Sequence, residues 1–327
     1  MTTATSSTMS TSKKPTWKRI LEQREVSVFL VVLALSVFLS LASDNFLSRA
    51  NINALILGLS FNAIIAVGMT VLMVSGGFDL SVGSTLALAG AVAGYAMVFW
   101  HMFWPLAALL GLAAGLLVGL ANGLIVTKLG VNPLIGTLGM MSVVRGVVLL
   151  VTSGFGISNL PQEFNNIAQG KLFGIQYPVY IMIVFIIVGD VLLRRTRYFR
   201  QSYFVGGNMK SARLSGIRVN RVLIVNYILA AVMAAVGGLL LTARFGSASV
   251  SAGVGVELQV VSAVVIGGAS LAGGEGTVLG SLLGITLMAL IANGLNLLGI
   301  NVYWQTIIIG AVLIIAVAAD SLSRRNQ

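Results

Sequence analysis

The chain has 327 residues, of which 57% are apolar and only 9% are charged, and its mean hydropathy is +0.99. A soluble domain carries about 25% charged residues, so this composition excludes a soluble protein and indicates one embedded in a membrane. We expect the net charge of +11 to attract anionic lipid at the membrane surface rather than to bind nucleic acid. Without cysteine and with one histidine, we expect no enzyme site, metal or cofactor.

The chain begins with residues 1–25, which are rich in serine and threonine and then in lysine and arginine. The apolar run over 26–43 is longer than the core of a secretory signal peptide and lacks a clear cleavage site. We therefore expect 1–25 to be a cytoplasmic basic tail and 26–43 to be a retained membrane span.

Ten apolar segments follow one another along the chain, and a helix needs about 20 such residues to cross a bilayer core. They are 26–43, 52–75, 80–100, 105–127, 134–153, 177–193, 222–243, 258–272, 277–298 and 302–319. These runs are too continuous for barrel strands, and in lipid only helices or closed barrels pair every backbone group. The sequence thus predicts an all-α, polytopic transmembrane helical bundle of about ten spans, a single membrane domain over 26–320, and a tail over 321–327.

The lysine and arginine residues predict the orientation of these spans. With the N-terminus inside, sixteen basic residues fall on inside segments and three on outside segments. Because basic residues concentrate in cytoplasmic loops, both termini are expected in the cytoplasm.

Spans two to five and seven to ten carry faint similarities in the same order. Ala-Asn-Gly-Leu at 121–124 recurs at 292–295, and Asp79-Leu80 resembles Glu257-Leu258. The pairs 66–68 with 235–237 and 130–132 with 299–301 have similar offsets. Five spans separate the copies, so the second copy runs in the opposite direction, as in the inverted repeats of transporters.

Four side chains are candidates for a translocation path. Glycine-interrupted segments begin at Asp79, which Ser81 follows two residues later, and at Glu257. Paired broken helices mark translocation paths. Alternatively, the two carboxylates only cap helix N-termini. Arg145 is a charge inside a span, which is costly in lipid, so it either lines the path or pairs with an outer acidic group such as Glu163.

Four stretches resemble one known family. They are Ser-Gly-Gly-Phe-Asp-Leu-Ser-Val-Gly-Ser at 75–84, Gly-Thr-Leu-Gly at 136–139 with Arg145-Gly146, Gly-Gly-Asn at 206–208 with 212–217, and 265–274 with Gly276 and Gly280. In this order they resemble the bacterial ABC-importer permeases of the ribose, xylose and galactose type, within the superfamily of branched-chain amino acid and monosaccharide permeases. The resemblance extends from about residue 26 to residue 320.

The resemblance implies a multi-pass permease subunit in the bacterial inner membrane that takes up a monosaccharide or sugar-like solute. It implies a second permease subunit, identical or different, a periplasmic sugar-binding protein, and a cytoplasmic ATPase with two nucleotide-binding domains in one chain. The chain lacks the Gly-x-x-x-x-Gly-Lys-Ser/Thr motif, so ATP hydrolysis is expected on the partner chain.

The segment 194–221 is expected to be the main cytoplasmic loop. Asn208 is a suitable N-cap for a short helix over 209–215, and Gly216 is a suitable stop. In the resembled family this segment couples the permease to the ATPase, and a loop that only sets topology is the alternative. The coupling residues so implied are Gly206, Gly207, Asn208, Ala212, Arg213, Ser215 and Gly216.

Two questions stay open at this level. An ion-coupled secondary transporter of a small polar solute is the alternative function, but it requires ionisable groups at the membrane midplane, and the spans have almost none. The outer segment 154–176 is either a landing surface for the binding protein or a soft connection between spans. The identity of the sugar is not encoded in any of these patterns.

Overall fold

The structure is a computed structural model that describes residues 24–301, 303–308, 310–311, 314–315 and 318. Its helices are α2 (Arg24–Ala42), α3 (Arg49–Val74), α4 (Val82–Val98), α5 (Trp104–Lys128), α6 (Pro133–Thr152), α7 (Gln162–Gln169), α8 (Tyr177–Arg195), α9 (Arg197–Gly207), α10 (Met209–Leu214), α11 (Val219–Phe245), α12 (Val256–Ile266) and α13 (Val278–Leu297). A small antiparallel hairpin, β1 (Lys171–Leu172) and β2 (Ile175–Gln176), joins α7 to α8. Nearly all of the predicted tail 1–25, the tail 321–327 and much of the predicted span 302–319 lie outside the described residues.

Seven of the described helices are long and apolar enough to cross a bilayer, namely α2, α3, α5, α6, α8, α11 and α13. The chain is therefore a polytopic helical membrane protein. Two further apolar helices, α4 and α12, have only 17 and 11 residues and are shorter than the predicted segments 80–100 and 258–272. α12 ends at Ile266 because Gly267 and Gly268 follow, and Gly268 takes a φ of 98°, which a right-handed helix does not allow.

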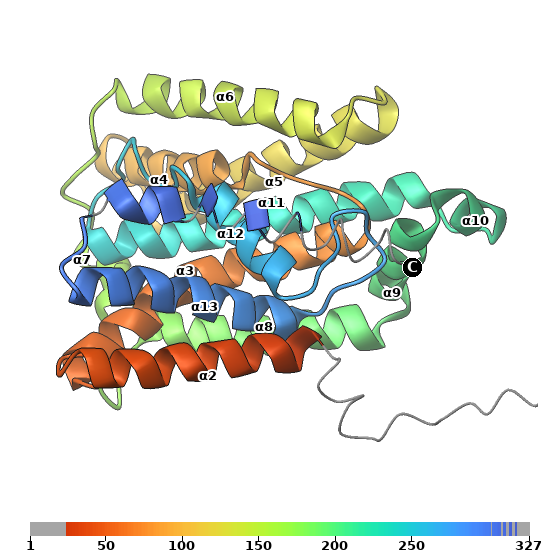
Figure 1. Cartoon of the computed structure of the whole chain (residues 1–327). Helices are drawn as coiled ribbons and strands as arrows, with labels where there is room; N and C mark the ends of the chain where they lie inside the picture. The colour runs from red at the N-terminus through yellow and green to blue at the C-terminus, as the bar shows by residue number, and fades with distance from the viewer. Residues whose placement is uncertain (1–23, 302, 309, 312–313, 316–317, 319–327) are drawn as a thin grey trace, which may run out of the picture.

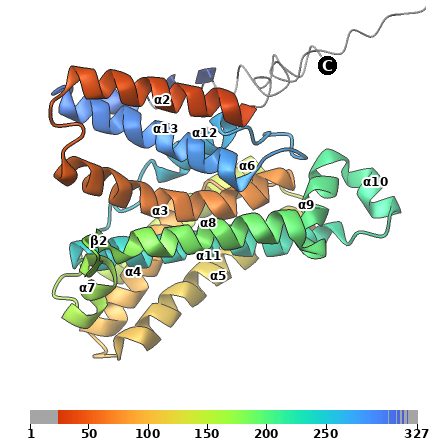
Figure 2. The same ribbon diagram turned by 90° about the horizontal axis from the view of Figure 1, so that it is seen from below.

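The long helix α11 lies at the centre of the bundle and contacts α3, α4 and α5 (Figures 1 and 2). The glycines of α5 explain how closely it approaches. A methyl group added at Gly119 would collide with the α11 backbone at Tyr227 and Ile228, and one at Gly123 would collide with Ile224. Without side chains at these positions the two helices pack backbone to backbone, the usual way in which helices associate in lipid.

Two short helices, α7 and α9, were not expected from hydropathy because neither is a continuous apolar run. α7 is amphipathic and buries Phe164 and Ala168 against the bundle. α9 begins after Thr196, whose Oγ1 accepts a hydrogen bond from the Phe199 amide at 3.4 Å. A Thr at this position is an ordinary N-cap signal, so α9 could have been recognised in the sequence.

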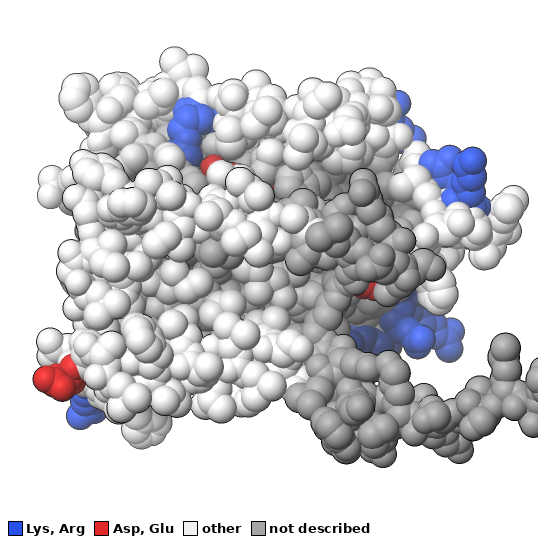
Figure 3. Space-filling view, viewed as in Figure 1, with Lys and Arg blue, Asp and Glu red and all other residues white. Residues whose placement is uncertain are grey.

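The two ends of the bundle differ in charge. At one end the Tyr203 hydroxyl of α9 donates to the Gly276 carbonyl at 2.8 Å, and the Thr277 hydroxyl donates to the Glu25 carboxylate at the start of α2. At the other end lie α7 and an isolated bridge between Ile157 and Ala248. Basic side chains gather at the α9–α10 end, whereas the surface between the ends is almost free of charge (Figure 3).

Candidate functional site

The break between α3 and α4 is held by a buried carboxylate. Asp79 has no exposed surface, and its Oδ1 accepts hydrogen bonds from the Ser81 amide at 2.7 Å and the Ser81 hydroxyl at 2.6 Å. The side-chain amide of Asn122, on α5, donates to both carboxylate oxygens at 3.2 Å. The adjacent Leu80 amide donates to the Thr137 hydroxyl of α6 at 3.1 Å. The break is therefore tied to two neighbouring helices.

This network makes Asp79 and Ser81 positioning residues of the break in this conformation. A buried carboxylate is costly unless hydrogen bonds compensate it, and the donors from Ser81 and Asn122 that do so here are neutral. Asp79 is also not the N-cap of α4, because Ser81 occupies that position. A direct contact of either residue with the solute stays a prediction, since both side chains are fully buried here.

The N-terminal ends of α4 and α12 meet. A Cβ at Gly83 would collide with the Gly253 carbonyl and the Glu257 carboxylate, and a Cβ at Gly253 would collide with the Gly83 backbone. Glu257 lies in the first turn of α12, and its Oε1 accepts a hydrogen bond from the Gly255 amide at 3.2 Å. The two short helices thus start at one place in the bundle interior.

A half-open cavity of about 420 Å³ lies beside this junction and contains two of the four predicted path residues. Its lining consists of Ser84, Met141, Ser142, Arg145, Gly146, Leu149, Val254 and Glu257. In Figure 3 a basic side chain with acidic atoms next to it interrupts the uncharged surface below α6. Arg145 is the only charged residue of α6 and Glu257 is the only one of α12.

Arg145 donates hydrogen bonds to backbone carbonyls and does not pair with Glu163. Its Nη1 donates to the carbonyls of Val250 and Ala252, both at 2.9 Å. The guanidinium thereby fixes the loop that leads into α12, and its remaining N–H groups are available to a ligand in the cavity. A guanidinium, a carboxylate and two serine hydroxyls around one space can pair with the hydroxyl groups of a polar, uncharged solute.

The predicted coupling helix is present as α10. Asn208 is its N-cap and accepts a hydrogen bond from the Ser211 amide at 2.9 Å, and Gly216 follows the helix with a φ of 82°. Ala212 is buried, whereas Arg213 and Ser215 are exposed. A groove of about 480 Å³ runs between α9 and α10, lined by Tyr203, Phe204, Gly207, Asn208, Ser211, Ala212, Ser215 and Ile217.

Gly206 connects this segment to both helix breaks. A methyl group at Gly206 would collide with the Val74 carbonyl at the end of α3 and with the Gly274 amide in the loop after α12. The Gly274 amide donates to that same Val74 carbonyl at 2.8 Å. A methyl at Gly273 would meet Gly206 and Gly76. Three of the four stretches that carry the family resemblance therefore touch at one point, through their backbones.

Burial raises the pKa of the Tyr203 hydroxyl, the largest influence on it, and the nearby Arg194 lowers that pKa. The hydroxyl thus stays protonated at neutral pH and keeps its hydrogen bond to Gly276. This bond is a second link between α9 and the loop before α13.

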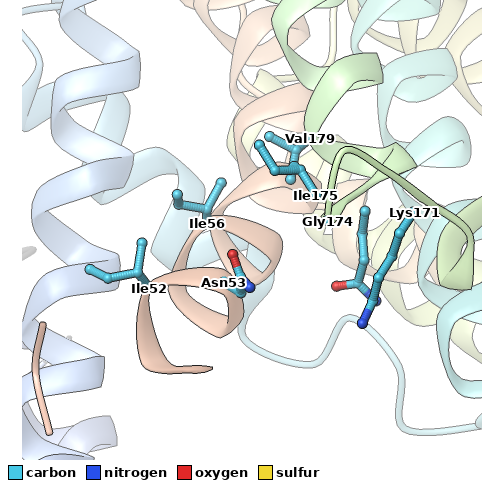
Figure 4. A pocket seen from close by; sticks show the side chains of 8 residues that line it. Ile52, Asn53, Ile56, Lys171, Gly174, Ile175 and Val179 are labelled. Carbon is cyan, nitrogen blue, oxygen red and sulfur yellow. The ribbon is translucent and has the colours of Figure 1, made fainter. Parts of the chain in front are cut away.

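The α7 end of the bundle has a separate cavity of about 280 Å³ (Figure 4). Its walls come from α3, the β1–β2 hairpin and the start of α8: Ile52, Asn53, Ile56, Lys171, Gly174, Ile175, Gln176 and Val179. It shows that the outer segment 154–176 is folded against the bundle and forms shaped surface at its end.

Sequence reasoning missed several residues of these sites. Asn122 appeared only as part of the repeat, although a lone amide in an apolar span is itself a signal of a buried polar partner. Its repeat counterpart Asn293 exchanges hydrogen bonds of 2.7 and 3.1 Å with Asn51 instead, so the two copies differ here. Thr137 and Ser84 lie in two of the stretches that carry the family resemblance, but neither was named as a site residue, because isolated hydroxyls are common in apolar helices.

The fold and these sites define a class: the chain is the permease subunit of an ABC importer, a transport component rather than an enzyme. Residues 51–317 match the family described as "Branched-chain amino acid transport system / permease component", and the chain belongs to this family.

Particular relatives cover almost the whole chain. The ribose import permease protein RbsC of Bacillus subtilis (strain 168) is 41% identical over 300 residues, which cover 91% of this chain and 92% of the relative. RbsC of Escherichia coli (strain K12) is 38% identical over 306 residues, covering 92% and 94%. The L-arabinose ABC transporter permease protein AraH of Azospirillum brasilense is 36% identical over 315 residues, covering 95% and 90%. No solved structure matches the chain.

Proposed function

We propose that this permease carries a monosaccharide or a closely similar polyhydroxylated solute inward across the bacterial inner membrane, driven by ATP hydrolysis on a partner. The relatives named for ribose and arabinose support the substrate class. The cavity beside the α4–α12 junction carries the proposal on the structural side, because it offers a guanidinium, a carboxylate and two hydroxyls in one apolar surface.

The ten-span topology and the inverted repeat are part of this proposal. The helices α3, α4 and α5 correspond in order to α11, α12 and α13. In each of these triplets the middle helix, α4 or α12, is the shortest. The start of α2 lies at the α9–α10 end, and most arginines of the described residues fall in or beside α9 and α10. Because basic residues accumulate on the inner side, we assign this end to the cytoplasm.

The ATPase partner is proposed to dock on α9 and α10. The groove between these helices is a surface on which another chain can fit. The backbone contacts of Gly206 with Val74, Gly273 and Gly274 would transmit a movement of this segment to both helix breaks at once. The periplasmic binding protein would then dock at the α7 end, on the segment 154–176 and its hairpin.

A second permease subunit is proposed to complete the path. The cavity at Arg145 and Glu257 is open on one side. The exposed surface of α6 beside it is apolar, with Leu138, Leu149 and Leu150 exposed. A second copy of the chain is the simplest partner that could close it.

Reconstituted transport tests the function against its rival. The permease is purified with its ATPase, placed in proteoliposomes with labelled ribose or arabinose and the binding protein, and supplied with ATP. We expect uptake that requires ATP and the binding protein. Uptake that instead follows a proton or sodium gradient, and that proceeds without the ATPase, would identify an ion-coupled transporter.

A further inference from the structure

A cavity of about 380 Å³ at the junction of α8 and α9 has no role in the function proposed above. It is lined by Leu193, Arg194, Arg200, Tyr203, Phe204 and Thr277. It shares Tyr203 and Phe204 with the groove beside α10 but has its own basic residues, which that groove lacks. Since Leu193 and Arg194 belong to the last turn of a membrane-spanning helix, the cavity lies at the depth of the lipid headgroups.

The two arginines of the cavity, Arg194 and Arg200, have N–H donors that no described residue occupies. Arg194 Nε lies 2.7 Å from Asp190 Oδ1, one turn earlier on α8. This ion pair uses one edge of the guanidinium, fixes its orientation and leaves the other edge for a ligand. The Arg200 side chain is exposed and has no hydrogen-bond or ion-pair partner among the residues that the structure describes. A second carboxylate near the cavity, that of Glu25, accepts a hydrogen bond from the Thr277 hydroxyl.

The apolar surroundings of the cavity continue into the membrane. Phe204 on its rim is 60% exposed and adds apolar surface beside the two arginines. On α8 the exposed residues Val184, Ile187, Val188 and Val191 form a stripe at helical spacing that leads up to Arg194. The cavity therefore combines donors for an anion with an apolar track of the kind that an acyl chain occupies.

We propose that this cavity binds the phosphate group of an anionic phospholipid, with Arg194 and Arg200 as its donors and the α8 stripe under one acyl chain. The local charge supports a lipid, because four arginines lie within residues 194–200, in the last turn of a span and just after it. Basic clusters of this kind on the cytoplasmic side of a membrane helix recognise anionic lipid. The assignment to the inner leaflet rests on the orientation proposed above, whereas the binding itself does not.

The test compares two arginine variants of α9 in the isolated permease. Arg200→Gln removes a donor of the cavity, and Arg197→Gln removes the same charge from an exposed side chain of the same helix that does not line it. Delipidated protein in neutral detergent is titrated with phosphatidylglycerol, and bound lipid is counted by native mass spectrometry. We expect Arg200→Gln to bind about fivefold more weakly, equivalent to ~1 kcal/mol, and Arg197→Gln to stay within about twofold of the unchanged protein.

The other outcomes overturn the proposal in different ways. Equal losses in the two variants would show that only the overall charge of the loop matters. Equal binding of phosphatidylcholine would exclude recognition of an anion. Saturation by inorganic phosphate or glycerol phosphate at similar concentrations would identify a site for a soluble anion. Unchanged phosphatidylglycerol binding in Arg200→Gln would exclude this arginine as a donor to the lipid phosphate. Because no transport is measured, failure here leaves the importer function untouched.

Discussion

At the scale of single residues, the chain places its few polar groups where they hold irregular backbone. Asp79 holds the α3–α4 break, and Arg145 holds the loop before α12. Both of these segments are irregular backbone between helices of a membrane protein. Irregular backbone at membrane depth is tolerated only where protein groups satisfy it or water reaches it. In this conformation both side chains therefore support irregular backbone segments.

The contribution of Asn122 to the Asp79 network can be measured by replacing it. In Asn122→Leu the buried carboxylate loses the donor that reaches both of its oxygens, and an unsatisfied buried group costs ~1–3 kcal/mol. We expect a clear fall in the melting temperature of the purified protein. The matched control is Thr127→Val, which removes a hydroxyl bonded only to the Gly123 carbonyl on the same helix. A fall of the same size in both variants would contradict the network's role.

The variant Arg145→Lys distinguishes the role of the guanidinium geometry from that of the positive charge. A lysine keeps the charge, but its flexible ammonium lacks the fixed planar geometry in which Nη1 reaches the carbonyls of Val250 and Ala252, and such charged hydrogen bonds contribute about 1.5–3 kcal/mol each. We expect strongly reduced uptake with normal membrane insertion. Arg244→Lys is the control, because the Arg244 guanidinium lies over Phe61 and Phe245, away from this cavity. Normal uptake in Arg145→Lys would show that charge alone suffices there.

At the scale of elements, the segment of α9 and α10 and the irregular segments after α3 and after α12 are in direct contact. Gly206 lies in the last turn of α9, Val74 ends α3, and Gly274 follows α12, yet these three backbones lie in contact. A rigid connection of this kind passes displacement on, since packed interiors do not absorb it. The glycine-rich stretches thus have a mechanical reason beyond close helix packing.

Two neighbouring glycines test this connection. In Gly206→Ala the new methyl group collides with Val74 and Gly274, whereas in Gly207→Ala it enters open space. Overpacking of this kind costs ~1–3 kcal/mol or displaces backbone. We expect Gly206→Ala to retain ATP hydrolysis in the assembled importer but to lose uptake, while Gly207→Ala transports normally. The readout is the ratio of solute moved to ATP hydrolysed, and equal ratios in both variants would count against the connection.

At the scale of the whole molecule, the sequence predicted seven of the membrane helices, because an apolar run of the right length is a local property. It predicted α10 from Asn208 and Gly216 for the same reason. It could not predict that Gly76, Gly206 and Gly273 meet, nor that Asn122 reaches Asp79, because these contacts join segments far apart in the chain. It also overestimated the lengths of α4 and α12, since hydropathy continues through breaks that glycine conformation creates.

The orientation of the whole molecule can be tested directly because the chain contains no cysteine. Single variants Ser211→Cys on α10 and Gln162→Cys on α7 place one thiol at each end, at positions that are exposed. With both termini inside, a membrane-impermeant maleimide added to intact spheroplasts should label Gln162→Cys, and Ser211→Cys should react only after lysis. The charge distribution requires this result, because basic segments stay on the cytoplasmic side during insertion. Labelling of Ser211→Cys in sealed cells would reverse the orientation and move the proposed ATPase surface to the wrong side of the membrane.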